Sequence, residues 1–335
     1  MDLIHANALL EEIGYITEIN RYDAELSQEL KATIENNSFA LMLPDEVWKL
    51  SPITEGHYIY IPNTEWGGQV ELVRHSTASK QVTLSGVTWR GMLYRKVIEP
   101  PAGQNHLTIA GMDANAAMAA IIGNALGSAF VVSAAVSGIT IGSHSFRYAN
   151  MLTGIEEMLS LHGAALEMTF NQVTRQVVVS ARAIVDYSAR IDLSQDYGVD
   201  MITTLGGFDR YNHIIALGAG ELEDRDILHV YRLDDGTITT TAPAWVGTAK
   251  DHAKTYDYTN PESLEKLQEG AAEMLVGYAP LSTVEMDPNV AGLELSLGDK
   301  VGARDRLVGM QGVVTVIGKI LTMDSTGIRV ETRVG

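Results

Sequence analysis

The residues that could do chemistry gather in one stretch of the sequence, YNHIIALGAGELEDRD (residues 211–226). Gly218, Ala219 and Gly220 follow a strand-like apolar run, as the turn of a dinucleotide-binding loop would. Such a loop also needs a third glycine and a helix whose N-terminal amides face the phosphate. Here Glu221 follows directly and a strand pattern then resumes. The stretch therefore predicts a turn between two strands and no nucleotide cofactor.

Acidic residues after this turn offer a second kind of chemistry. Glycoside hydrolysis uses two carboxyl groups held across the substrate, and the sequence supplies candidates at Glu221, Glu223, Asp224 and Asp226. Proximity in the sequence does not by itself create a cleft, and acids that flank a turn usually form a solvated face. We therefore predict no catalytic residue, and a hydrolase of the host cell wall or of a surface polysaccharide is the alternative.

Metal and nucleophile chemistry lack their usual patterns. The nine histidines form no HExxH helix, and the chain has no cysteine and no GxSxG elbow. The segment RLDDG (residues 232–236) has two acids before a glycine but not the other ligands of a calcium loop. His213 lies in an apolar run, which favours a core or interface histidine. The sequence predicts no metal, no cofactor and no enzymatic activity.

The composition and net charge of the chain limit the kinds of partner that it is expected to bind. The 335 residues are 46% hydrophobic and carry a formal charge of −18, which disfavours a grip on DNA or on an anionic membrane. An uncharged run between Asp113 and Arg147 is long enough to suggest a transmembrane helix. Its many Asn, Gly and Ser residues favour a packed element instead, so we predict no membrane insertion.

The elements that must position these residues change in type along the chain. Three short β-branched or aromatic runs, at residues 57–63, 67–75 and 80–89, predict antiparallel hairpins that close into a barrel or sandwich. The doublet Pro100-Pro101 marks a boundary after them.

Helical spacing follows this boundary. Asp113 and Asn150 are placed to cap two helices, the second ending at Gly163. Alternating apolar residues over 166–181 then predict a hairpin. Together these patterns predict an α+β unit.

Strands return from about residue 195, with one interruption. Asn260 and Pro261 suit the N-cap and first helical positions of a helix whose apolar spacing runs to Leu275. Gly327 is expected to turn a terminal hairpin. The predicted order is therefore β, α+β, and β with an inserted helix.

These segments together resemble the tail-tip or baseplate hub proteins of phages, relatives of the N-terminal hub part of tail-associated lysins. The strongest match is the third region, which includes residues 211–236, 255–275 and 296–335. The resemblance is most specific over residues 211–236 and 296–335 and weaker elsewhere. The family's motif positions fall here on Asn212, His213, Gly218, Gly220, Glu221, Asp224, Arg225, Gly298, Asp299, Arg304 and Asp305.

The resemblance implies a mainly β fold with an α+β part. Two tube-like antiparallel β-barrel domains, residues 1–102 and 195–335, would flank an α+β middle domain at 103–194, with a helix near 261–276 inserted in the second barrel. Two such domains per chain in a homotrimer would build a ring of pseudo-sixfold symmetry that matches a hexameric tail tube.

The implied function is that of a noncatalytic virion structural protein at the tail tip, assembled in the host cytoplasm. It would close the tail tube, bind the tail tube proteins above and fibre, spike or lysin proteins below, and leave a channel for DNA during genome ejection. An acidic lumen would let DNA pass without adhering. Because the sequence stops at Gly335, directly after the hub's final strand, cell-wall cleavage is expected to need another polypeptide.

The motif residues are predicted to act structurally. Gly218, Gly220 and Gly298 are expected to adopt backbone conformations that a β-carbon would oppose. Four charged motif residues are expected to form ion pairs within or between subunits: Glu221, Arg225, Asp299 and Arg304. A receptor-recognition module is a third functional hypothesis.

Overall fold

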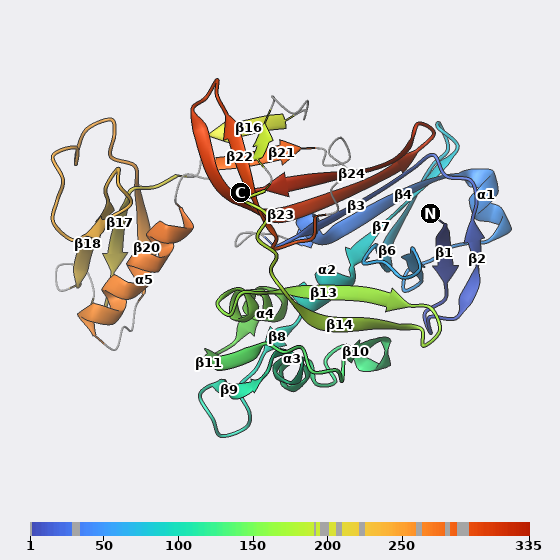
Figure 1. Cartoon of the computed structure of the whole chain (residues 1–335), viewed down its shortest axis with the longest axis horizontal. Helices are drawn as coiled ribbons and strands as arrows, with labels where there is room; N and C mark the ends of the chain where they lie inside the picture. The colour runs from blue at the N-terminus through green and yellow to red at the C-terminus, as the bar shows by residue number, and fades with distance from the viewer. Residues whose placement is uncertain are drawn as a thin grey trace. The chain divides into compact units, whose positions relative to one another are not determined.

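The computed structural model describes residues 2–28, 34–190, 192–194, 201–205, 210–220, 225–258, 263–278, 282–286 and 295–335 (Figure 1). The chain forms two compact units, one made of Met1–Ile202 with Val284–Gly335 and the other of Thr203–Thr283. Each unit has its own buried apolar core.

One large sheet lies mostly in the first unit. Its strands follow the order β16-β21-β24-β23-β3-β4-β7-β6-β5-β1-β2, with β22 paired to β23 and β15 paired to β22. The strands from the N-terminal part are β1 (Leu3–Ala6), β2 (Glu12–Ile16), β3 (Arg21–Ser27), β4 (Ser38–Pro44), β5 (Tyr58–Tyr60), β6 (Gly67–Ser76) and β7 (Gln81–Thr88). The others are β15 (Asp192–Ser194), β16 (Met201–Leu205), β21 (Ser282–Met286), β22 (Lys300–Asp305), β23 (Met310–Asp324) and β24 (Gly327–Val334).

Alternation of apolar side chains explains which face of this sheet is buried. In β4, SFALMLP, every second residue is buried, and β3 follows the same rule. A strand turns successive side chains to opposite faces, so these residues line one core. Its members on β3 and β4 are Tyr22, Ala24, Leu26, Phe39, Leu41 and Leu43.

The sheet joins sequence ends that lie far apart. Strand β23 pairs antiparallel with β3 from Gly318↔Ser27 to Asp324↔Arg21, and Figure 1 shows these strands side by side. The terminal hairpin turns at Gly327 as predicted. Strands from the predicted first and third domains thus share one sheet, and the contacts group residues 1–202 with 284–335. The division into tube-like barrel domains stays a prediction.

An α+β layer completes the first unit. Asp113 caps α3 (Ala114–Ile122) by accepting the Asn115 N–H, and Asn150 caps α4 (Met151–Ser160) by accepting the Thr153 N–H, which confirms both predicted caps. The predicted hairpin is β13 (Ala164–Asn171) with β14 (Gln176–Ala183). The remaining elements are η1 (Ile34–Asn37), α1 (Asp45–Leu50), α2 (Trp89–Tyr94), β8 (Val97–Ile98), β9 (Leu107–Asp113), η2 (Gly127–Ala129), β10 (Phe130–Val132), β11 (Thr140–Phe146) and β12 (Ala149–Asn150).

The long uncharged run after Asp113 is divided among short elements. It contains the nine residues of α3 and then η2, β10 and β11. Among the residues that the structure describes, no helix has the length and apolar character needed to cross a membrane.

The second unit is a four-stranded sheet with one helix packed on it. The strand order is β19-β18-β17-β20, with β17 (His213–Leu217), β18 (Ile227–Arg232), β19 (Ile238–Thr239) and β20 (Ala253–Asp257). Helix α5 (Leu264–Gly277) supplies Leu267, Ala271 and Leu275 to a core shared with β17 and β18. The mainly β fold with an α+β part is thus confirmed.

The start of α5 corrects one prediction. The helix begins at Leu264 rather than at 261, because Ser263 has an extended backbone and its hydroxyl accepts the Lys266 N–H at 3.2 Å. Asn260 and Pro261, the predicted cap and first helical residue, lie outside the described residues.

Candidate functional site

The Gly298-Asp299 motif forms a tight turn before β22. Gly298 has a φ of +90°, and a β-carbon there would lie 2.8 Å from the Ala165 Cβ. Both the left-handed backbone and the close approach of β13 therefore require glycine. The backbone prediction for Gly298 is confirmed.

Asp299 is the polar centre of this turn. Its carboxylate is buried and accepts hydrogen bonds from the Arg182 guanidinium at 2.7 Å, the Val185 N–H at 3.1 Å and the Ser296 N–H at 3.0 Å. Arg182 also donates to the Leu297 carbonyl at 2.5 Å. The ion pair expected at Asp299 thus forms within the chain, and it ties the turn to β14.

Arg304 and Asp305 lie at the other end of β22. Asp305 is buried and accepts the Leu307 N–H at 2.9 Å, so it shapes the turn into β23. Arg304 is paired in register with Gln311 of β23 and with Ser194 of β15. These two motif residues therefore belong to the β22–β23 hairpin, whereas Asp299 holds the junction between the Gly298 turn and the α+β layer.

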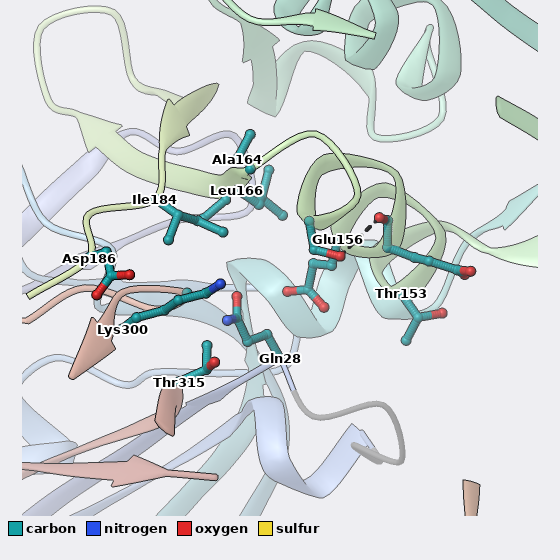
Figure 2. A pocket seen from close by; sticks show the side chains of 14 residues that line it. Gln28, Thr153, Glu156, Ala164, Leu166, Ile184, Asp186, Lys300 and Thr315 are labelled. Carbon is teal, nitrogen blue, oxygen red and sulfur yellow. Dashed lines mark hydrogen bonds between the residues drawn. The ribbon is translucent and has the colours of Figure 1, made fainter. Parts of the chain in front are cut away.

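A cavity of about 500 Å³ opens beside the Gly298 turn. Figure 2 shows Glu156 of α4 on one side, Asp186 and Lys300 on the other, and Gln28 between them. Leu166 contributes apolar surface to its wall. The cavity therefore combines an apolar surface with charged groups of both signs.

Glu156 joins this cavity to a buried arginine. Arg90 is 1% exposed and donates to Glu156 Oε1 at 2.6 Å and to the Leu166 carbonyl at 2.7 Å. Burial raises the pKa of Glu156 to about 7, and the Arg90 charge offsets part of that effect. The pair fixes α4 and β13 against α2.

The sequence reasoning missed both Arg90 and Arg182. Each guanidinium pairs with a carboxylate distant in the sequence, 66 residues away for Arg90 and 117 for Arg182. One available signal was Glu156, an acidic residue that directly follows the buried Ile155 on a helix whose Leu152, Ile155, Met158 and Leu159 are buried. No local spacing indicates its partner.

In the second unit, Asn212 and His213 hold a loop against β17. Asn212 donates to the Lys250 carbonyl at 2.8 Å and accepts the His252 N–H at 2.9 Å. His213 is buried, and its two ring nitrogens lie 2.8 Å from Asp251 Oδ1 and 2.8 Å from His229 Nδ1. His213 is thus a hydrogen-bonded core histidine, as the sequence favoured.

Burial and hydrogen bonding have opposite effects on the pKa of Asp251. Burial by itself raises the pKa of this carboxyl, but hydrogen bonds from the Gly247 N–H and from His213 outweigh it, and the pKa is lowered. The carboxylate form is therefore the one that fits the loop.

The glycines of the opening stretch act for different reasons. The turn lies between antiparallel strands β17 and β18, which confirms the predicted hairpin. Gly220 has a φ of +95°, as expected. Gly218 has no left-handed backbone; instead a β-carbon there would meet Leu267 of α5 at 3.0 Å, so the requirement at Gly218 is space.

The charged motif residues of this turn are described only in part. Glu221 and Asp224, like Glu223, lie outside the described residues. Arg225 pairs with Asp257 at 2.5 Å and donates to the Gly218 carbonyl at 3.2 Å. Because Asp257 is well exposed, this pair contributes little to stability.

The contacts of the motif residues in the described part of the chain favour structural roles for these residues. Within the described ranges no group of three His, Asp or Glu side chains is arranged to hold a metal ion. The motif residues of β17 and of the Gly298 turn hydrogen-bond to neighbouring strands and loops of their own unit. They position backbone segments, namely the Gly298 turn before β22 and the loop at residues 250–252 beside β17.

Comparison with known proteins reveals similarity at the level of structure. No protein-family model matches the chain, and no curated protein matches it in sequence. A tail protein from Neisseria meningitidis MC58 has a TM-score of 0.54 and 16% sequence identity, over 99% of this chain and 95% of that one. The 43 kDa tail protein of prophage MuSo2 from Shewanella oneidensis has a TM-score of 0.56 and 12% identity, over 100% and 98%.

A third solved structure agrees with these two. The prophage tail protein gp18 from Listeria monocytogenes EGD-e has a TM-score of 0.50 and 13% identity, over 100% of this chain and 94% of that one. The chain therefore has the fold of phage tail proteins, which confirms the resemblance at the level of the fold.

Proposed function

We propose that this chain, which has the fold of phage tail proteins, is a noncatalytic structural protein of a phage or phage-derived tail. Its place is the tail tip, where it closes the tail tube as a homotrimeric baseplate hub. It connects the tube to distal fibre, spike or lysin proteins and leaves a channel through which DNA passes.

The observation that carries this proposal is similarity over the whole length of the chain. Three proteins described as tail proteins match 99 to 100% of this chain, and the matches cover 94 to 98% of their own chains. A module shared by otherwise unrelated proteins would match over one part only. Similarity over the complete arrangement of elements favours a shared architectural role.

The burial and the hydrogen-bond partners of the motif residues support a structural role. Asp299 and His213 are buried and have protein partners within their own unit. Catalytic groups need an accessible face toward substrate, whereas these side chains hold turns and loops. The formal charge of −18 supports a channel to which DNA does not adhere.

The oligomeric state tests the trimer directly. Light scattering coupled to gel filtration should give three times the chain mass of 36.3 kDa, and electron microscopy should reveal a ring with threefold symmetry and a central hole. Immunogold labelling of tail particles from cells that carry the gene should mark the tail tip. A monomer with label along the tail shaft would contradict the hub position.

Zymography separates the hub from the alternative hydrolase. The wild-type chain should leave no clearing in a gel that contains host cell wall. Clearing that Glu221→Gln and Glu223→Gln abolish, with the oligomer intact, would establish a tail-associated hydrolase instead.

A further inference from the structure

A basic cavity opens at one end of the sheet in the second unit. Its volume is about 430 Å³, and it lies where β17 begins, β18 ends and β20 begins. The strand directions bring these three segments to the same end, because β18 runs antiparallel to β17 and β20 runs parallel to it. The charged side chains described in its lining are Arg210, Arg232, Asp234 and Lys250.

These basic residues are concentrated in an acidic part of the chain. Between Thr203 and Thr283 the sequence contains six basic and thirteen acidic residues. Three of the six basic residues line the cavity, and Asp234 is the one acid among the described lining residues. Three cations and one carboxylate give this lining a local charge of +2, whereas the whole chain carries −18.

The guanidinium of Arg232 has neutral partners. It donates to the carbonyls of Tyr211, Leu275 and Tyr278, each at 3.2 Å. Leu275 and Tyr278 lie at the C-terminal end of α5, where free carbonyls favour a cation. Burial lowers the pKa of Arg232, and among the described residues no carboxylate pairs with it. An anion in the cavity would compensate a charge that the protein itself meets with dipoles.

Arg210 and Lys250 add two cations that these carbonyls do not engage. None of the ion pairs described in this unit involves either side chain. The Asn212 side chain fixes the segment that carries Lys250, because it donates to the Lys250 carbonyl at 2.8 Å and accepts the His252 N–H at 2.9 Å. The cavity therefore has a backbone held in place before any ligand arrives.

The charge and size of the cavity favour a compact anion over a polyanion. Salt screens charges beyond about 8–10 Å, so the cations act on a group inside the cavity. A long duplex would also meet the surface of a chain whose formal charge is −18. A phosphate monoester carries about 1.5 to 2 negative charges at pH 7 and offers three acceptor oxygens, which matches the local charge better than a single carboxylate does.

We propose that this cavity binds a phosphate group, free or carried by a small molecule. Arg210 and Lys250 donate to its oxygens, since both residue types bind phosphate, and Arg232 supplies a fixed positive charge in the wall. The inference goes beyond the proposed function, because the cavity is built by the second unit of one chain and does not require assembly of a tail.

Calorimetric titration of the full-length chain tests the site, with inorganic phosphate and glycerol 2-phosphate as probes at constant ionic strength. Both should bind saturably, and Lys250→Gln and Arg210→Gln should each raise the Kd about fivefold or more. Lys266→Gln is the matched control, because it removes one positive charge from α5 of the same unit, outside the described lining. It should leave the Kd within about twofold, since salt screens distant charges.

The two probes distinguish the source of the phosphate. Tighter binding of glycerol 2-phosphate would identify an ester as the ligand, and equal binding would identify the free ion. Either result supports the proposal if it depends on Lys250.

Three results would overturn the inference. The first is no saturable binding of either probe at about 10 mM, above the millimolar range of weak ligands. The second is an equal loss in Lys266→Gln, which would assign the effect to net charge. The third is tighter, Lys250-dependent binding of a duplex DNA or of an acidic peptide, which would replace phosphate by another ligand. Circular dichroism of each variant should match that of the wild type.

Discussion

At the residue scale, the Gly298-Asp299 turn combines a backbone requirement with a buried charge. Gly298 holds a left-handed backbone against β13, and Asp299 gathers three donors around one carboxylate. Removing one partner of a buried ion pair leaves an uncompensated charge. Neighbouring positions in the sequence thus stabilise the junction in different ways.

Gly298→Ala is expected to destabilise the protein by about 2 kcal/mol or more. The change adds left-handed strain of roughly 1–2 kcal/mol and a contact at 2.8 Å with the Ala165 Cβ. Urea unfolding measures the loss. Gly309→Ala is the matched control, because Gly309 has a φ of +70° and open space, so it should lose the strain term alone. An equal loss of unfolding free energy in both variants would show that the close contact with Ala165 adds no destabilisation.

Glu156 should make stability depend on pH. Its pKa is raised from 4.5 to about 7 in the folded chain, so the folded state holds this proton more tightly than the unfolded state. The resulting stabilisation is complete below about pH 4.5 and is lost as the pH rises through about 7.

Unfolding at a series of pH values measures this effect. Glu156→Gln should flatten the dependence of the unfolding free energy between pH 5 and 7.5, since glutamine binds no proton. A wild-type slope that persists in the variant would assign the titration to another group.

At the element scale, α5 and the β17-β18-β20 sheet form a core separate from the large sheet. Leu267 is 0% exposed in that core, whereas Leu264, one turn earlier on the same helix, is 57% exposed. The helix depends on this packing, because short helices are marginal in water by themselves.

Leu267→Ala should therefore destabilise the second unit by about 2–5 kcal/mol, the usual range for truncating a buried leucine. Hydrogen exchange should rise in β17 and β18 and stay unchanged in β3 and β4. Leu264→Ala is the control and should shift stability by no more than about 0.5 kcal/mol. Equal acceleration in both units would show that they unfold together.

At the scale of the whole molecule, the pairing of β3 with β23 brings the two ends of the chain into one sheet. The N-terminal and C-terminal parts of the first unit therefore depend on each other. The net charge is also a property of the whole molecule, since it determines whether the protein attracts or repels a polyanion such as DNA.

The formal charge of −18 predicts that the protein does not retard a short DNA duplex in a mobility assay, even at low salt where phosphate contacts are strongest. Binding at micromolar protein that disappears as salt rises would reveal a basic surface on the assembled ring. That result would contradict a lumen built for passage without adhesion.

The sequence by itself determined features that depend on a few neighbouring residues. The helix caps at Asp113 and Asn150, the β13–β14 hairpin, the turn at Gly327 and the left-handed Gly298 follow from local hydrogen bonding, alternation and backbone sterics. The mainly β fold was predicted for the same reason. The start of α5 was misplaced because Ser263 offered a competing cap close to Asn260.

Only the tertiary structure decided which distant segments meet. Arg182 with Asp299, Arg90 with Glu156, and β3 with β23 are pairings across long stretches of chain. These pairings depend on strand register and on how the layers pack against each other. No local pattern of residues encodes the register or the packing. The role of Gly218 belongs here too, because it depends on where Leu267 of α5 packs.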